Sequence, residues 1–118
     1  PAVIAWYLND ELPLSMRDRL EAHQRWVEEE DPDHPTWVVL YQVDELVGYL
    51  KTFDVIGTDP YPIGKNRPLS LAADWTIKTR EAVADARALW MVPQAFQWND
   101  GDRRPTRAEM RCMAWQCI

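Results

Sequence analysis

The chain has 118 residues, of which 47% are hydrophobic, so it is long and apolar enough for one domain with a buried core. Its 13 basic and 19 acidic residues give a formal net charge of -6, which argues against nucleic acid or an anionic membrane surface as a partner. No apolar run approaches the roughly 18 residues that a membrane-spanning helix needs. We therefore expect one globular domain over residues 1–118.

Four short segments rich in valine, isoleucine and aromatic residues have the composition of buried strands. They are residues 3–9 (VIAWYLN), 36–43 (TWVVLYQV), 54–59 (DVIGTD) and 89–98 (LWMVPQAFQW). Pro93 disturbs pairing in the last segment, so the sequence leaves open which faces Gln94 and Gln97 occupy.

Helical patterns follow each of these segments. The expected helices are residues 14–30, 44–52, 70–87 and a last helix that runs to the end of the sequence. Asp44 and Ser70 are suitable N-caps for the second and third helices. Thr106 and Glu109 have the spacing of a capping box, which predicts the start of the last helix.

The alternation of strands and helices predicts an α/β fold of four consecutive βα units with parallel strands. Such a series forms either a doubly wound open sheet or part of a (β/α)8 barrel. In both architectures the functional site lies beyond the carboxyl ends of the strands.

Each predicted strand is followed closely by a carboxylate, in the segments NDE, QVDE, TDPYP and QWND. None is followed by GxGxxG or GxxxxGK[ST], so nucleotide binding loses support and we expect no cofactor. Acids and aromatic side chains with few cations suit a neutral, polyhydroxylated ligand.

Strand alternation selects among these acids. Tyr7, Asn9 and Glu11 share one face of the first strand, which places Glu11 over the cleft. The same alternation in the third strand places Asp59 and Tyr61 at the rim. The structural alternatives are that Glu11 is a helix-entry acid and that the Asp59 segment is only a turn.

Several other residue types are assigned structural roles. His23 and His34 have no second ligand at a suitable spacing, so no metal site is predicted. Cys112 and Cys117 would point about 140° apart on a helix and should not form a disulfide. Five tryptophans within periodic apolar patterns are expected in the core, namely Trp6, Trp37, Trp75, Trp90 and Trp115.

Five blocks of the sequence resemble consecutive blocks of the second half of (β/α)8-barrel glycoside hydrolases, including β-galactosidase-like and less characterised members. The blocks are WYLNDELP, HPTWVVL, FDVIGTDPYPIG, WMVPQAFQW and RPTRAEMRCMAWQCI. Their order matches strands four to seven and the helix after strand seven. The resemblance implies a half-barrel fragment of a TIM-barrel domain that hydrolyses O-glycosidic bonds of a carbohydrate. The fragment alone is expected to be inactive.

The resemblance also implies site residues. Glu11 matches the acid/base carboxylate after strand four, with Asp10 beside it, and we expect it to be the proton donor. The glutamate nucleophile that ends strand seven in these enzymes has no match here, because the segment carries Gln94 and Gln97. Asp59 could supply the second carboxylate. The predicted sugar-contacting residues are Asn9, Asp10, Tyr61, Gln94, Gln97 and Trp98.

The second hypothesis is a non-catalytic α/β domain of unknown function that is stabilised by self-association. A four-stranded parallel sheet leaves two strand edges unpaired and one face uncovered, which favours association with another copy. We therefore expect a homo-oligomer, with the first strand of one copy beside the fourth strand of the other in a closed barrel. The alternative geometry is two open sheets packed face to face.

Overall fold

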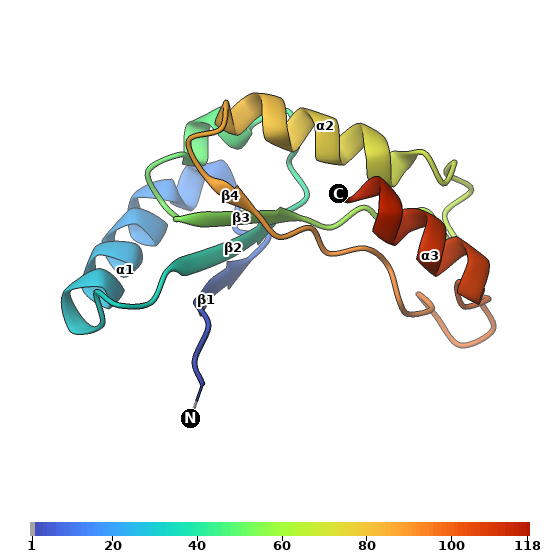
Figure 1. Ribbon diagram of the computed structural model, residues 1–118, viewed down its shortest axis with the longest axis horizontal. Helices are drawn as coiled ribbons and strands as arrows, with labels where there is room; N and C mark the ends of the chain where they lie inside the picture. The colour runs from blue at the N-terminus through green and yellow to red at the C-terminus, as the bar shows by residue number, and fades with distance from the viewer. Residues whose placement is uncertain (1) are drawn as a thin grey trace.

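The computed structural model describes residues 2–118 and confirms an α/β fold. Its sheet has four parallel strands in the order β1 (Trp6–Asp10), β2 (Thr36–Leu40), β3 (Val55–Thr58) and β4 (Ala88–Leu89), as Figure 1 shows. Each strand therefore pairs with the next one along the chain, as expected for successive βα units.

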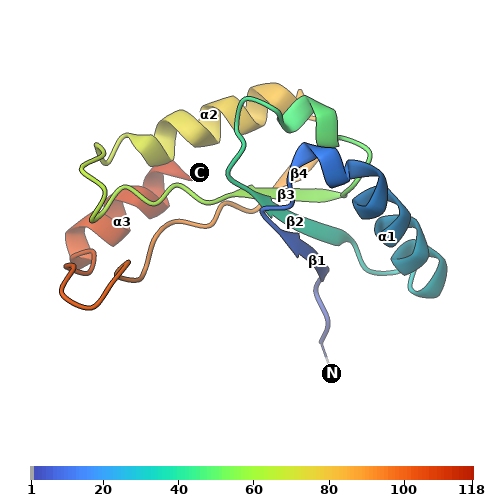
Figure 2. The same cartoon turned by 180° about the vertical axis from the view of Figure 1, so that it is seen from behind.

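Helical segments cover one face of this sheet. They are η1 (Leu14–Met16), α1 (Arg17–Glu30), η2 (Leu46–Tyr49) and α2 (Leu71–Val83). In Figures 1 and 2, α1, η2 and α2 all lie on the same side of the strands. The last helix, α3 (Arg107–Gln116), packs against α2 instead, on the side toward which the strands point.

The core fills the space between the sheet and these helices. From the strands it takes Leu8, Val38, Leu40 and Ile56, and from the helical side Leu20, Val27, Leu46, Tyr49, Phe53 and Val83. A smaller cluster around Ile63, Ala72 and Met113 holds α3 against α2. Most of the helix predicted over residues 14–30 is present as α1, which buries Leu20, Gln24 and Val27 along one side.

Two of the predicted helices are shorter than expected. Residues 44–52 form only the 3₁₀ helix η2, whose N-cap position is Glu45 and not Asp44. The Asp44 carboxylate accepts a hydrogen bond from Lys78 at 2.7 Å. The helix predicted over 70–87 ends at Val83, where Ala84 adopts the left-handed conformation with φ 46°. The side chain of Ser70 makes no capping bond.

The capping box at the start of α3 is confirmed. The Thr106 hydroxyl accepts a hydrogen bond from the Glu109 backbone N–H at 3.2 Å, and the Glu109 carboxylate accepts one from the Thr106 N–H at 2.8 Å. Arg103 donates two further bonds of 2.8 Å to the same carboxylate. Together these bonds lower the pKa of Glu109 to about 2. Cys112 and Cys117 are free thiols, as expected.

The predicted strand over residues 89–98 is wrong for most of its length. Regular pairing ends at Leu89, although Trp90 and Val92 still donate backbone hydrogen bonds to Ile56 and Thr58 of β3, at 2.8 and 3.0 Å. The chain leaves the sheet after Pro93, and the Gln94 side chain bonds to Ile63 and Phe96.

The face of the sheet opposite the helices carries a row of aromatic rings. Trp37 lies between Tyr7 and Trp90, with ring centroids 4.9 and 5.8 Å apart. No helix within residues 2–118 covers this face (Figure 2). The expectation of core tryptophans is therefore wrong: Trp6, Trp37, Trp75, Trp90 and Trp115 are all at least partly exposed.

Candidate functional site

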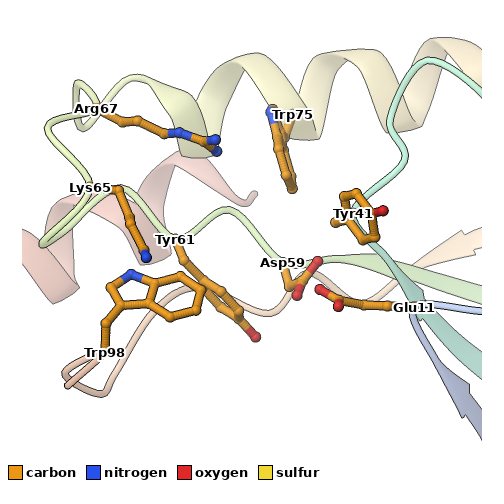
Figure 3. A pocket seen from close by; sticks show the side chains of 8 residues that line it. All are labelled: Glu11, Tyr41, Asp59, Tyr61, Lys65, Arg67, Trp75 and Trp98. Atoms are coloured by element: carbon orange, nitrogen blue, oxygen red, sulfur yellow. The ribbon is translucent and has the colours of Figure 1, made fainter.

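A cavity of about 350 Å³ opens beyond the carboxyl ends of the strands, where parallel α/β proteins place their sites. Side chains from the segments after β1, β2, β3 and β4 and from α2 surround it (Figure 3). The lining residues are Glu11, Tyr41, Asp59, Tyr61, Lys65, Arg67, Trp75 and Trp98. Four of the predicted site residues, Glu11, Asp59, Tyr61 and Trp98, thus lie around one cavity.

An irregularity in β1 changes which of its side chains share a face, although Asp10 does not line the cavity. Tyr7 pairs with Trp37 and Asp10 pairs with Val39, so one extra residue lies in β1 between them. Asp10 therefore takes the face that simple alternation assigned to Asn9. The Asn9 side chain instead accepts a hydrogen bond of 2.8 Å from the Leu12 N–H, so the predicted facing of Asn9 is wrong.

Glu11 reaches the cavity through its backbone conformation. Its φ is 58°, in the left-handed region that non-glycine residues rarely adopt. A backbone hydrogen bond from Glu11 to Val39 at 2.8 Å holds this turn, and the Tyr49 hydroxyl donates to the Leu12 carbonyl at 2.9 Å. Neighbouring elements thus fix a strained residue whose side chain points toward Asp59 (Figure 3).

Asp59 and Glu11 form a carboxylate pair. Asp59 follows β3 directly and is only 4% exposed, whereas Glu11 is on the open side of the cavity. Burial, together with a hydrogen bond to Glu11 and its negative charge, raises the pKa of Asp59 to about 7. One oxygen of Asp59, Oδ1, has no hydrogen-bond partner among the described residues. The pair therefore holds a proton near neutral pH.

The two carboxyl groups of the pair are coupled to each other. A hydrogen bond to Glu11 and the negative charge of Glu11 are both among the causes that raise the pKa of Asp59. Glycosidases instead place two carboxyl groups on opposite sides of the bond that they cleave. The coupling of Glu11 and Asp59 therefore favours a shared proton over separate roles as an acid and a nucleophile.

Two tyrosines extend the acidic end of the site. Burial and the nearby Asp10 raise the pKa of Tyr7 to about 12. Burial and the negative charge of Asp59 also raise the pKa of Tyr61. Both phenols therefore stay protonated at neutral pH and can donate hydrogen bonds to a ligand or to a carboxylate.

Next to this acidic end, three aromatic rings, one of them Tyr61, brace one another and a lysine. Tyr61, Phe96 and Trp98 make mutual edge contacts with centroids 4.9 to 5.7 Å apart. The Lys65 ammonium group lies 4.4 Å from the centroid of the Trp98 ring. Since Lys65 occupies one face of Trp98, that face is not an open platform for a sugar.

The two glutamines have other partners. Gln94 is 1% exposed and bonds to both backbone groups of Ile63, at 2.8 and 3.0 Å, and to the Phe96 carbonyl at 3.0 Å. It ties the loop after β3 to the segment after β4. Gln97 accepts a bond of 3.1 Å from Arg104. Neither glutamine lines the cavity.

Four cavity residues were absent from the sequence predictions: Tyr41, Lys65, Arg67 and Trp75. Tyr41, Lys65 and Arg67 follow β2 and β3 within a few residues, so their position after a parallel strand was a usable signal. Trp75 lies on α2, and its apolar spacing gave no indication of a site.

The described residues contain no group of three histidine, cysteine, aspartate or glutamate side chains that could hold a metal ion. Over the same residues, none of the helices has the length and apolar character needed to cross a membrane. No family model, no curated protein and no solved structure matches this chain.

Proposed function

We propose that this chain is part of a (β/α)8-type domain that cleaves O-glycosidic bonds, contributing four consecutive βα units of the barrel. The observation that carries the proposal is the proton-holding pair of Asp59 and Glu11, at the carboxyl ends of two parallel strands and beside an aromatic-lined cavity. A protonated carboxyl group near neutral pH is what protonation of a glycosidic oxygen requires.

In this proposal Asp59 and Glu11 together deliver one proton to the leaving oxygen. Asp59 holds the proton because it is the buried partner, and Glu11, on the open side, passes it to the substrate. The sequence predicted Glu11 as the proton donor, and in this proposal Glu11 shares that role with Asp59. Asp10, which lies near enough to raise the pKa of Asp59, is the proposed second carboxylate.

The test measures hydrolysis of nitrophenyl glycosides by a polypeptide that carries this chain with its neighbouring βα units. Glu11→Gln and Asp59→Asn should each reduce kcat at least about a hundredfold, because general acid catalysis contributes on that scale. Glu45→Gln removes an exposed acid that also follows a strand but lies outside the cavity, so it should leave kcat unchanged. Full activity of both site variants would refute the proposal.

One observation bears on the second hypothesis, a non-catalytic domain stabilised by self-association. The sheet face that carries Tyr7, Trp37 and Trp90 has no helix over it within residues 2–118. In a complete barrel the same face would line the interior. Self-association of the isolated chain is therefore compatible with both hypotheses, and only the activity measurement separates them.

A further inference from the structure

The proposed function leaves two cations in the cavity without a role. Lys65 and Arg67 lie on the loop between β3 and α2, six and eight residues after Asp59. Neither forms an ion pair or a side-chain hydrogen bond with any residue of the described part of the chain. Acidic residues outnumber basic ones in this protein, so carboxylate partners were available elsewhere.

Both cations are exposed residues at the cavity, and an aromatic ring supports one of them. The ring of Trp98 supports the Lys65 ammonium group at 4.4 Å without neutralising its charge, and Tyr61 braces Trp98 in turn. In Figure 3 the Arg67 guanidinium lies along the α2 side of the cavity, on the same side as Trp75. Two positive groups thus border the end of the cavity remote from Glu11.

The cavity therefore has acidic side chains at one end and basic side chains at the other. Its strand end carries the Asp59 and Glu11 pair, and its loop end carries Lys65 and Arg67, with aromatic rings between them. A neutral sugar would leave the loop end without a counter-charge. A sugar that carries an acidic group would place its anion against two donors and its glycosidic oxygen toward the proton-holding pair.

We propose that Lys65 and Arg67 form an anion subsite, so that the ligand is an acidic sugar rather than a neutral one. This inference rests on the proposed function for the role of the acid pair. It replaces the expectation of a neutral, polyhydroxylated ligand. The anion is a carboxylate, as in a uronic acid, or a sulfate ester. Both groups can accept bidentate hydrogen bonds from arginine and are attracted by the positive charge of lysine.

The test compares matched sugars by calorimetric titration and ligand-observed NMR on the 118-residue chain. Methyl glucuronide and methyl galacturonide are measured against methyl glucoside and methyl galactoside, with glucose 6-sulfate as the ester arm. We expect the acidic sugar that binds best to bind at least about tenfold more tightly than the neutral sugar with the same ring configuration. This ratio corresponds to about 1.4 kcal/mol. Raising the salt concentration should reduce this difference.

Substitutions test whether Lys65 and Arg67 cause the preference for acidic sugars. Lys65→Gln and Arg67→Gln should each lower the affinity for the acidic sugar toward that of the neutral one and leave neutral-sugar binding unchanged. Lys51→Gln and Arg80→Gln remove exposed cations outside the cavity and should have no effect. Equal binding of acidic and neutral sugars, no binding of either, or wild-type preference in both cavity variants would overturn the inference. Equally tight binding of inorganic sulfate would reduce the subsite to a general anion site and would also overturn it.

These results are separable from those of the proposed function. Loss of cleavage in Glu11→Gln and Asp59→Asn without any acidic preference would support the hydrolase and refute the subsite. Acidic preference that depends on Lys65 and Arg67, with full cleavage in both acid-pair variants, would refute the shared proton donor and support the subsite.

Discussion

The carboxyl group of Asp59 links the chemistry of the site to the stability of the fold. Its pKa of about 7 in the folded chain is far above the ordinary value of 3.8, chiefly because of burial. Between these two values the folded chain retains a proton that the unfolded chain releases. The free energy of unfolding should therefore fall as the pH rises from about 4 to about 7 and then level off with respect to this group.

The Asp59→Asn variant tests this pH dependence. It removes the charge but keeps the shape, so we expect its stability relative to the native chain to be greater at pH 8 than at pH 5, by roughly 1–3 kcal/mol. Urea unfolding followed by circular dichroism measures both values. Asp100→Asn, at an exposed position, serves as the control and should show no such difference. An unchanged gap between pH 5 and pH 8 in Asp59→Asn would contradict the assignment.

The buried side-chain amide of Gln94 should contribute to the stability of the fold. Gln94→Ala leaves both backbone groups of Ile63 and the Phe96 carbonyl without their side-chain partner, which should lower the free energy of unfolding by about 2–3 kcal/mol. Gln97→Ala removes a single bond to Arg104 and should cost no more than about 0.5 kcal/mol. Denaturant titration compares the two. Equal effects would show that Gln94 does not hold the two loops together.

At the scale of elements, the N-termini of α2 and α3 can be compared, because only one of them has a capping side chain. Thr106 accepts a capping bond at the start of α3, whereas Ser70 makes none at the start of α2. Thr106→Ala should therefore destabilise the chain by about 1 kcal/mol, and Ser70→Ala should change its stability by less than about 0.5 kcal/mol. Thermal unfolding gives the comparison. A larger loss in Ser70→Ala would contradict the observed caps.

The sequence predicted elements better than it predicted their details. The parallel order and the helix predicted over residues 14–30 follow from regular patterns, and the structure has that order and an α-helix over residues 17–30. Simple alternation failed at Asn9, because the extra residue in β1 depends on pairing with β2, which no local pattern reveals. The strand predicted over residues 89–98 failed because its composition is that of a buried strand, whereas regular pairing ends at Leu89.

The site was only partly visible in the sequence for a similar reason. Glu11 and Asp59 could be placed from strand ends, since parallel strands deliver those ends to one edge. That they share a proton depends on the φ of Glu11 and on the burial of Asp59, both of which are tertiary properties. Gln94 was read as a ligand contact because an amide near a strand end resembles one, and only its three backbone bonds identify a structural role.

At the scale of the whole molecule, the chain exposes more surface than a compact monomer. Its accessible surface is 7496 Å², against about 6,600 Å² expected for its mass of 13.8 kDa. Its radius of gyration is 15.1 Å, against about 13.5 Å for a compact chain of this length. The excess of about 900 Å² is close to one partner's share of a stable interface, about 800 Å².

We therefore predict that the isolated chain forms a homodimer through the uncovered sheet face. Sedimentation equilibrium at micromolar concentration should give twice the monomer mass, and Trp90→Ser should shift the chain toward monomer because Trp90 belongs to the aromatic row on that face. Trp115→Ser removes a ring that is 73% exposed on α3, away from the sheet, and should leave the association unchanged. A stable monomer at these concentrations would refute the prediction.

The absence of any tryptophan from the buried core has a consequence for optical work on this protein. All seven indoles are at least partly exposed in the described structure, while the fully buried aromatic side chains are Tyr49 and Phe53. Tryptophan emission should therefore be red-shifted even in the folded chain and change little in wavelength on unfolding. The same emission would respond to events at the cavity, through Trp75 and Trp98, and at the open face, through Trp37 and Trp90. In this molecule intrinsic fluorescence is a reporter of ligands and partners, and a poor reporter of folding.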